Sequence, residues 1–416
     1  MPLQKILFKP GVNRENTRYT TEGGWYECDK IRFRQGNPEI LGGWQRISAY
    51  TYNGVCRSLW NWVTLGGLNL VGVGTNTKFY IQNGGAYYDI TPIRVTVTLG
   101  TDPFTANGTT TVTVSATAHG ATTGSFVTFS GATGTYASTL NAEYQITVVN
   151  ANSYTITTPT ALAAGSYGGS SVSAAYQVNA GPAYAVPLTG WGAGAWGYGT
   201  WGTGGTSTIS LQLWNQINFG QNLIYGPRGG AMYYWDANTG VSTRGVALTS
   251  LGDAETPVVQ NTFTVSDTSR FLIAFGTNDP NSATPNAIDP MFIRWSDQED
   301  PFTWIPAPTN QAGSIRLSHG SEIVTTVQTR QEIVVFTDSS VYSMQYLGPP
   351  YVWGSQLLGD NISIISPNSA IIASGIVYWM GVDKFYAYDG RVQTLNCDLR
   401  RFIFQDINLE KKAQVF

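Results

Sequence analysis

A two-strand unit recurs in the outer parts of the sequence. Each copy has an apolar strand, a short turn rich in Gly, Asn, Asp or Ser, and a second strand that opens with an aromatic residue. The copies occupy residues 69–81, 222–235, 332–344 and 375–388, and a looser copy with a longer turn occupies residues 271–295. Repeated hairpins of this kind predict an all-β fold and favour a β-propeller, whose buried inner strands form continuous apolar runs. A stacked β-sandwich is the competing architecture.

The middle of the chain follows a different pattern. Short strands are predicted at residues 112–114, 126–129, 144–149 and 154–156, with Gly, Asn and Ser between them. Between Val95 and Thr206 the only acidic or basic residues are Asp102 and Glu143. We expect a small β-barrel or β-sandwich inserted into the larger domain and kept soluble by threonines on its exposed face.

These differences in composition and strand pattern divide the sequence into four parts. Residues 1–92 hold an N-terminal arm and the first propeller blade or blades, and residues 93–180 hold the inserted β domain. Residues 181–206 form a segment rich in Gly and Trp, and residues 207–416 hold the remaining blades. Residues 413–416 resemble the opening of a further strand, so we expect the natural polypeptide to continue beyond them.

Three tryptophans of the third part are candidate interface residues. Trp191, Trp196 and Trp201 recur every five residues in a glycine-rich stretch, and side chains so large and apolar are rarely left in water. The segment either folds back on its own domain or anchors in a neighbouring subunit, and stacking on a sugar is a third alternative.

Three cations of the arm are the other interface candidates. Lys30, Arg32 and Arg34 are expected on one face of a strand, with Ile31 and Phe33 on the opposite face. Such a cationic face either meets DNA phosphate or an acidic partner, or protects an edge strand from aggregation.

Composition narrows the classes of function. Charged residues make up only 12% of the 416 residues, aromatic residues make up 13%, and the net charge is −3. A protein that binds nucleic acid by neutralising phosphates needs a concentrated positive surface, which this composition does not provide. If DNA meets this protein, we expect passage or containment without sequence recognition. Low charge and many aromatic residues instead favour large interfaces between subunits.

Patterns that carry catalysis or bind metals are sparse. The sequence has two histidines, His119 and His319, and three widely spaced cysteines, Cys28, Cys56 and Cys397. We therefore expect no His-dependent triad, no metal site and no disulfide, and we expect the cysteines to be buried as small apolar residues. No P-loop, GxSxG or EF-hand pattern occurs. The sequence predicts a protein without enzymatic activity and without a cofactor.

One acidic segment keeps an alternative open. Asp297, Glu299 and Asp300 lie between Trp295 and Trp304, in a stretch that faintly resembles the Asp-box turns of sialidases but lacks their glycine. The carboxylates either bind a cation or act as the paired acids of a glycosidase. The other interpretation is a hairpin loop in which Asp and Pro set the turn and the tryptophans enter the core.

The outer parts also carry a family resemblance. Residues 8–14 (FKPGVNR), 24–34 (GWYECDKIRFR), 36–39 (GNPE) and 42–46 (GGWQR) resemble the opening of tail proteins from short-tailed double-stranded DNA bacteriophages. Residues 331–342 (QEIVVFTDSSVY) resemble the matching stretch of the phage tail nozzle, or packaged-DNA stabilisation, proteins. The resemblance covers residues 1–92 and 207–416. The insertion is similar instead to small β-barrels that decorate phage proteins.

The resemblance implies a structural virion protein. Nozzle proteins form a homohexameric ring below the portal and its adaptor proteins, line the channel through which double-stranded DNA leaves, and carry tail spikes or fibres. With no secretory signal and no apolar run of about 18 residues, we expect a soluble protein made in the host cytoplasm. The alternatives are a carbohydrate-binding or glycan-cleaving propeller that recognises a receptor, and a bacterial propeller that binds peptides.

Overall fold

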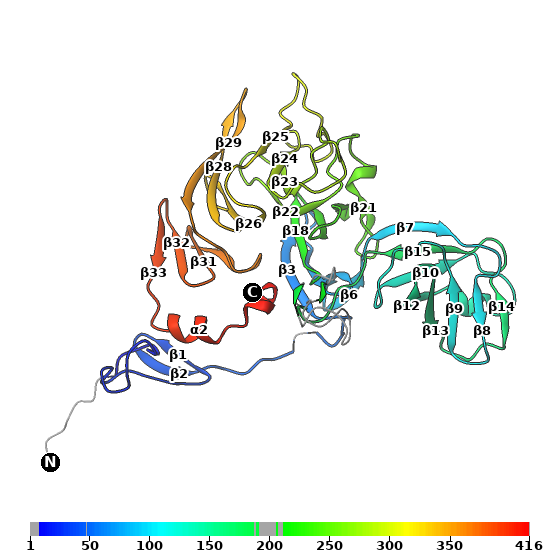
Figure 1. Cartoon of the computed structure of the whole chain (residues 1–416), viewed down its shortest axis with the longest axis horizontal. Helices are drawn as coiled ribbons and strands as arrows, with labels where there is room; N and C mark the ends of the chain where they lie inside the picture. Colours follow the sequence, from blue (N-terminus) through cyan, green and yellow to red (C-terminus); the bar gives the residue numbers. More distant parts are fainter. Residues whose placement is uncertain (1–7, 47, 187–188, 191–204, 207–210, 416) are drawn as a thin grey trace, which may run out of the picture. The chain divides into compact units, whose positions relative to one another are not determined.

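The computed structural model describes residues 8–46, 48–186, 189–190, 205–206 and 211–415. The chain divides into two compact units, of which one comprises Met1–Ala49 with Leu317–Phe416 and the other comprises Tyr50–Arg316. Antiparallel strands form most of the regular structure in both units (Figure 1). The prediction of an all-β fold is confirmed.

Three four-stranded antiparallel sheets belong to the unit Tyr50–Arg316, and in each the strands follow one another in sequence order. They consist of β3 (Cys56–Val63), β4 (Asn69–Thr75), β5 (Phe79–Asn83) and β6 (Ala86–Asp89); of β18 (Trp214–Phe219), β19 (Asn222–Pro227), β20 (Tyr233–Trp235) and β21 (Val246–Ala247); and of β22 (Gln260–Val265), β23 (Leu272–Thr277), β24 (Phe292–Trp295) and β25 (Gly313–Arg316). The short helices η1 (Ala237–Thr239) and η2 (Leu248–Ser250) lie between them in sequence.

The first strands of these sheets lie against one another. Strand β18 contacts both β3 and β22, and Gln216 of β18 donates hydrogen bonds to Ser58 Oγ and to the carbonyl of Gly72. Aromatic side chains fill the space between the first two sheets, where the Phe79 ring centroid lies 5.1 Å from that of Trp214. Face-to-face packing of this kind buries the apolar runs that the sequence shows.

Glycine permits the close approach of the first two sheets. A Cβ atom on Gly74 of β4 would meet the ring of Trp214 at 2.8 Å and Ser58 Oγ at 2.5 Å. Real Cβ atoms do not come so close to other heavy atoms, so glycine at this position leaves room for Trp214 against β4.

Two further four-stranded sheets belong to the other unit. They consist of β26 (Ile323–Gln328), β27 (Ile333–Thr337), β28 (Ser340–Gly348) and β29 (Val352–Asp360), and of β30 (Ala370–Ala373), β31 (Ile376–Met380), β32 (Phe385–Tyr388) and β33 (Val392–Leu395). Their shared core includes Val334, Phe336 and Trp379. All five residues of β27 are buried, as expected for a continuous apolar run.

All five hairpins that the sequence analysis identified are the two middle strands of these five sheets. The apolar strand of each hairpin is the second strand of its sheet, and the strand after the turn is the third. Strands β5, β20, β24 and β32 open with an aromatic residue as predicted, whereas β28 opens with Ser340 and has its first aromatic residue at Tyr342. Each hairpin therefore gains one further strand on either side.

The arm and the C-terminal segment belong to the same unit. The arm holds a two-stranded ribbon of β1 (Ile31–Arg34) and β2 (Asn37–Ile40), and the C-terminal segment holds α2 (Arg400–Asp406) and η3 (Leu409–Gln414). The Arg14 backbone N–H donates to the Asp398 carbonyl at 3.0 Å, and the Arg14 guanidinium lies over the Phe402 ring. Residues 413 and 414 lie in the helix η3, so the expected strand opening at 413–416 is not observed in the described residues.

Residues 93–177 form two further sheets around one core. One sheet has the order β11 (Glu143–Gln145), β10 (Phe126–Ser130), β15 (Ser173–Gln177), β7 (Ile93–Thr98), and the other has the order β12 (Thr147–Asn150), β13 (Ser153–Thr157), β9 (Thr111–Ser115), β8 (Phe104–Ala106), β14 (Gly165–Tyr167). A single helical turn, α1 (Ala137–Leu140), precedes β11. Alternating burial along β9, β10 and β13 puts apolar residues inside and threonines outside.

The prediction of a single strand at residues 144–149 is wrong in one respect. The chain breaks at Ile146 into β11 and β12, which belong to different sheets. Ile146 is buried between them, where its N–H donates to the Ser125 carbonyl and its own carbonyl accepts from the Gly124 N–H. The break lets one segment contribute to both sheets of the small domain.

Candidate functional site

The arm ribbon carries the three cations that the sequence analysis named. Arg32 and Arg34 are exposed on one face of β1, while Ile31 and Phe33 are half-buried on the other. Lys30 directly precedes the strand and has a φ of 56°, so it does not continue the alternation of β1. The Arg32 Nε atom donates to Glu39 Oε2 of β2 at 3.0 Å.

Large apolar side chains of the arm are open to solvent. Ile40 is 80% exposed, Trp44 is fully exposed, and Leu41 between them is also exposed. A two-stranded ribbon is marginally stable in water, and a cluster of exposed apolar residues is typical of an interaction site. The arm therefore has the character of a segment that binds a partner.

The other interface candidates, Trp191, Trp196 and Trp201, lie outside the described residues. The strands β16 (Thr189–Gly190) and β17 (Gly205–Thr206), which flank them in sequence, pair with each other.

The acidic segment at residues 295–304 is a hairpin loop. Asp297 Oδ1 accepts hydrogen bonds from the backbone N–H groups of Gln298 and Gln311, and Asp300 accepts from the Phe302 N–H and the Thr303 hydroxyl. Both flanking tryptophans are buried. Glu299 occupies the turn with a φ of 58°. The carboxylates of Asp297 and Asp300 are thus occupied in setting the loop.

The histidines and cysteines are also dispersed. His119 is buried, with one ring nitrogen 2.9 Å from the Asn150 carbonyl and the other accepting from the Ala121 N–H. The three cysteines are free thiols and are half-buried, so the expectation that they are buried is wrong. Within the described ranges, no group of three or more His, Cys, Asp or Glu residues could hold a metal ion.

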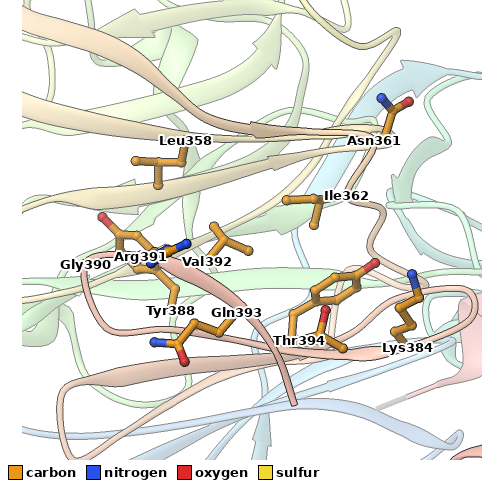
Figure 2. A pocket seen from close by; sticks show the side chains of 11 residues that line it. Leu358, Asn361, Ile362, Lys384, Tyr388, Gly390, Arg391, Val392, Gln393 and Thr394 are labelled. Atoms are coloured by element: carbon orange, nitrogen blue, oxygen red, sulfur yellow. The ribbon is translucent and has the colours of Figure 1, made fainter. Parts of the chain in front are cut away.

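A cavity of about 450 Å³ lies beside strands β32 and β33 (Figure 2). Its polar lining includes Lys384 and Arg391, which Figure 2 shows toward opposite ends, with Asn361 on the side of Lys384 and Gln393 on the side of Arg391. Leu358, Ile362 and Val392 supply apolar walls. Among the residues that the structure describes, no carboxylate contributes to the lining.

Tyr388 of the cavity lining is held by a partly buried hydrogen-bond cluster. The Tyr388 hydroxyl donates to Glu332 Oε1 at 2.6 Å, and Glu332 Oε2 also accepts from Ser343 and Gln345. Burial alone would raise the pKa of Glu332, but these hydrogen bonds outweigh it and hold the pKa below its ordinary value. A charged Glu332 therefore holds the Tyr388 ring in place at the cavity.

An ionic cluster joins the insertion to the sheets of its unit. The Lys78 ammonium donates to Asp89 Oδ2 at 2.7 Å and to the Glu143 carboxylate, and the Arg244 guanidinium contacts both acids. The Lys78 side chain is only 4% exposed. Lys78 directly precedes β5, Asp89 ends β6, Arg244 precedes β21, and Glu143 opens β11 of the insertion. Glu143 also accepts a hydrogen bond from Gln177.

Sequence reasoning missed both the cavity and this cluster. The only available signal for the cluster was that Glu143 is one of two charged residues in a long neutral segment. The Tyr386 and Tyr388 pair in β32 could have indicated an aromatic cavity wall, but the residues facing it come from the distant end of β29.

Comparisons with known proteins give weak similarity. No protein-family model matches the sequence, and no curated protein is significantly similar to it. Among solved structures, the phage phi92 endosialidase is similar over 82% of this chain and 55% of its own, with 12% identity and a TM-score of 0.27. The extracellular domain of a protein described as a hybrid two-component system from B. thetaiotaomicron covers 89% of this chain and 57% of its own, with 10% identity and a TM-score of 0.18.

This chain thus spans little more than half the length of either structure. At these TM-scores the function has to be argued from the chain itself. In the described part of the chain, no helix is long and apolar enough to cross a membrane.

Proposed function

We propose that this chain is a structural subunit of the tail of a short-tailed bacteriophage. In this proposal the five four-stranded sheets are the blades of a β-propeller, and copies of the chain form a hexameric nozzle ring below the portal and adaptor proteins. The ring lines the DNA exit channel, retains the packaged DNA and anchors tail spikes or fibres. The protein acts in the virion, without catalysis.

The observation that carries the proposal is the exposed apolar arm. Ile40, Leu41 and Trp44 extend from a ribbon that is too small to be stable on its own, so they indicate a partner surface. A homo-oligomer supplies such a surface in every copy.

Charge supports the role in a DNA channel. The net charge is −3, and Arg32 of the arm is already paired with Glu39. A wall with few free cations does not hold phosphates, so double-stranded DNA can pass without sequence recognition.

Solution mass and electron microscopy test the proposal. We expect the purified full-length chain to form a six-fold ring in negative stain, with a matching mass by light scattering. A chain that stays monomeric at every concentration and is absent from purified phage tails overturns the proposal.

A glycan-binding protein is the second candidate function, and the cavity beside β32 and β33 is the observation that favours it. Two cations, two amides and an aromatic wall suit an acidic sugar, whereas the lack of a carboxylate in the lining does not suit hydrolysis. Calorimetric titration with a uronic-acid oligomer, with a neutral hexose oligomer as control, tests it. Selective binding that is lost in Lys384→Gln supports this function, and equal or absent binding rejects it.

A further inference from the structure

The last strand of each four-stranded sheet is its outer edge, because the first strands of neighbouring sheets lie against one another within each unit. Four of the five last strands are short. Strands β6, β25 and β33 have four residues and β21 has two. Each also contains or closely follows a charged residue: Asp89, Arg316, Arg391 and Arg244. Short, charged edges are the usual protection against pairing with other chains.

Strand β29 is the exception among these five edges. It has nine residues, its one charged residue is the last, Asp360, and residues 352–359 contain no Lys, Arg, Asp or Glu, so its uncharged stretch is longer than any of the other four edges. Residues 353–357 pair with residues 342–346 of β28 without a register shift, so this stretch is regular. Both Gln356 and Leu357 are exposed. A long edge with a regular, uncharged stretch is a template for a further strand.

The arm of the same unit contains a strand with an open edge that could pair with β29. Strand β1 pairs only with β2 in the described chain, so its other edge is open. It contains no proline, whereas β2 contains Pro38. Its four residues fit the regular stretch of β29. If β1 paired with β29, its half-buried side chains Ile31 and Phe33 would lie beside Leu357. Arg32 and Arg34, on the other face of β1, would lie beside the uncharged Gln356.

We infer that the β1–β2 ribbon of one copy adds as a strand to the β29 edge of the next copy. This inference rests on the proposed ring and names its subunit contact. The contact uses two different surfaces of the chain, which is the head-to-tail arrangement that closes into a ring. Pairing of β29 with β29 would instead give an isolated two-fold dimer.

A matched pair of variants tests the contact in the full-length chain. Leu357→Lys puts a charge on β29, and Leu395→Lys makes the same change on the short edge β33, where the leucine is 42% exposed compared with 38% for Leu357. We expect Leu357→Lys to lose ring assembly and Leu395→Lys to keep it, as measured by light scattering. If circular dichroism shows that Leu357→Lys is unfolded, Gln356→Lys takes its place.

Cysteine crosslinking tests the identity of the partner strand. A chain with both Arg34→Cys and Gln356→Cys should form disulfide-linked multimers on a non-reducing gel, while each single variant, which retains the three native thiols, should not. A disulfide within one chain, or a ring that survives Leu357→Lys, overturns this contact and leaves the proposed ring intact. A wild-type chain that never assembles overturns the ring itself.

Discussion

The Lys78 ammonium donates to the Glu143 carboxylate and so connects the first four-stranded sheet to the inserted domain. This link uses one of the two acidic residues of the insertion. The other, Asp102, accepts a hydrogen bond from the Gly169 N–H at 2.7 Å and thus serves a loop within the insertion. The two acids consequently have different roles, one between domains and one within a domain.

Removal of the Glu143 charge should destabilise the protein. In Glu143→Gln the buried Lys78 ammonium keeps Asp89 but loses its second carboxylate, so we expect a loss of about 1–3 kcal/mol in the free energy of unfolding. Asp102→Asn is the matched control, because an exposed amide oxygen can still accept from Gly169. Denaturant unfolding of the full-length chain measures both, and equal losses would contradict the role given to Glu143.

The same cluster should make stability depend on pH. Burial would raise the pKa of Asp89, but the charges of Arg244 and Lys78, with hydrogen bonds from Lys78 and Thr91, lower it below its ordinary value. A carboxyl whose folded pKa is depressed stabilises the fold above its unfolded pKa of about 3.9, and this contribution disappears as the pH falls through the folded pKa.

We therefore expect wild type to be more stable than Asp89→Asn at neutral pH and the difference to shrink below a pH of about 4. Unfolding curves across a pH series test this expectation. A difference that stays constant into acid would show that charge is not the cause.

Gly74→Ala should destabilise the packing of the first two sheets. The new methyl group would clash with the Trp214 ring and with Ser58, and overpacking of this kind costs about 1–3 kcal/mol. Gly66→Ala, in the loop of the same sheet, is the control, because its Cβ would meet nothing nearer than Thr64 Oγ1 at 3.8 Å. Thermal unfolding should separate the two variants, and a silent Gly74→Ala would refute this account of the glycine.

Trp44→Ser should weaken assembly without changing the stability of the chain. Trp44 is fully exposed and close in sequence to the exposed Ile40 and Leu41, so its loss removes apolar surface from the partner-binding side of the arm. Tyr19→Ser is the control, because Tyr19 is 96% exposed in the same arm but lies apart from that apolar cluster in sequence. Light scattering gives the assembly and thermal unfolding the stability. Assembly unaffected by Trp44→Ser would argue against the arm as the contact.

The sequence predicted the hairpins well because each is local. In four of them an apolar run, a turn and a second strand lie within about a dozen residues, and turn chemistry fixes such pairs without help from distant residues. Lys30 shows where local reasoning fails, since its positive φ removes it from the strand that simple alternation predicts. Ile146 shows a second failure, because the break there serves two sheets that only the tertiary structure brings together.

The ionic cluster and the cavity could not be predicted from the sequence in the same way. Lys78, Asp89, Glu143 and Arg244 meet across three segments of the chain, and nothing in the sequence pairs them. The cavity wall likewise combines the end of β29 with β32 and β33.

The insertion leaves and rejoins its host through neighbouring strands, since Ile93 of β7 is the partner of Gln177 in β15. A module with adjacent entry and exit points can be exchanged for another, or trimmed to a short linker, without altering the register of the host sheets. The substitute must, however, bring an acid to the position of Glu143, or the swap leaves the buried Lys78 ammonium with Asp89 as its one carboxylate in this cluster. The outward faces of such a module are thus free to vary in sequence, whereas the residue that contacts Lys78 is constrained to be acidic.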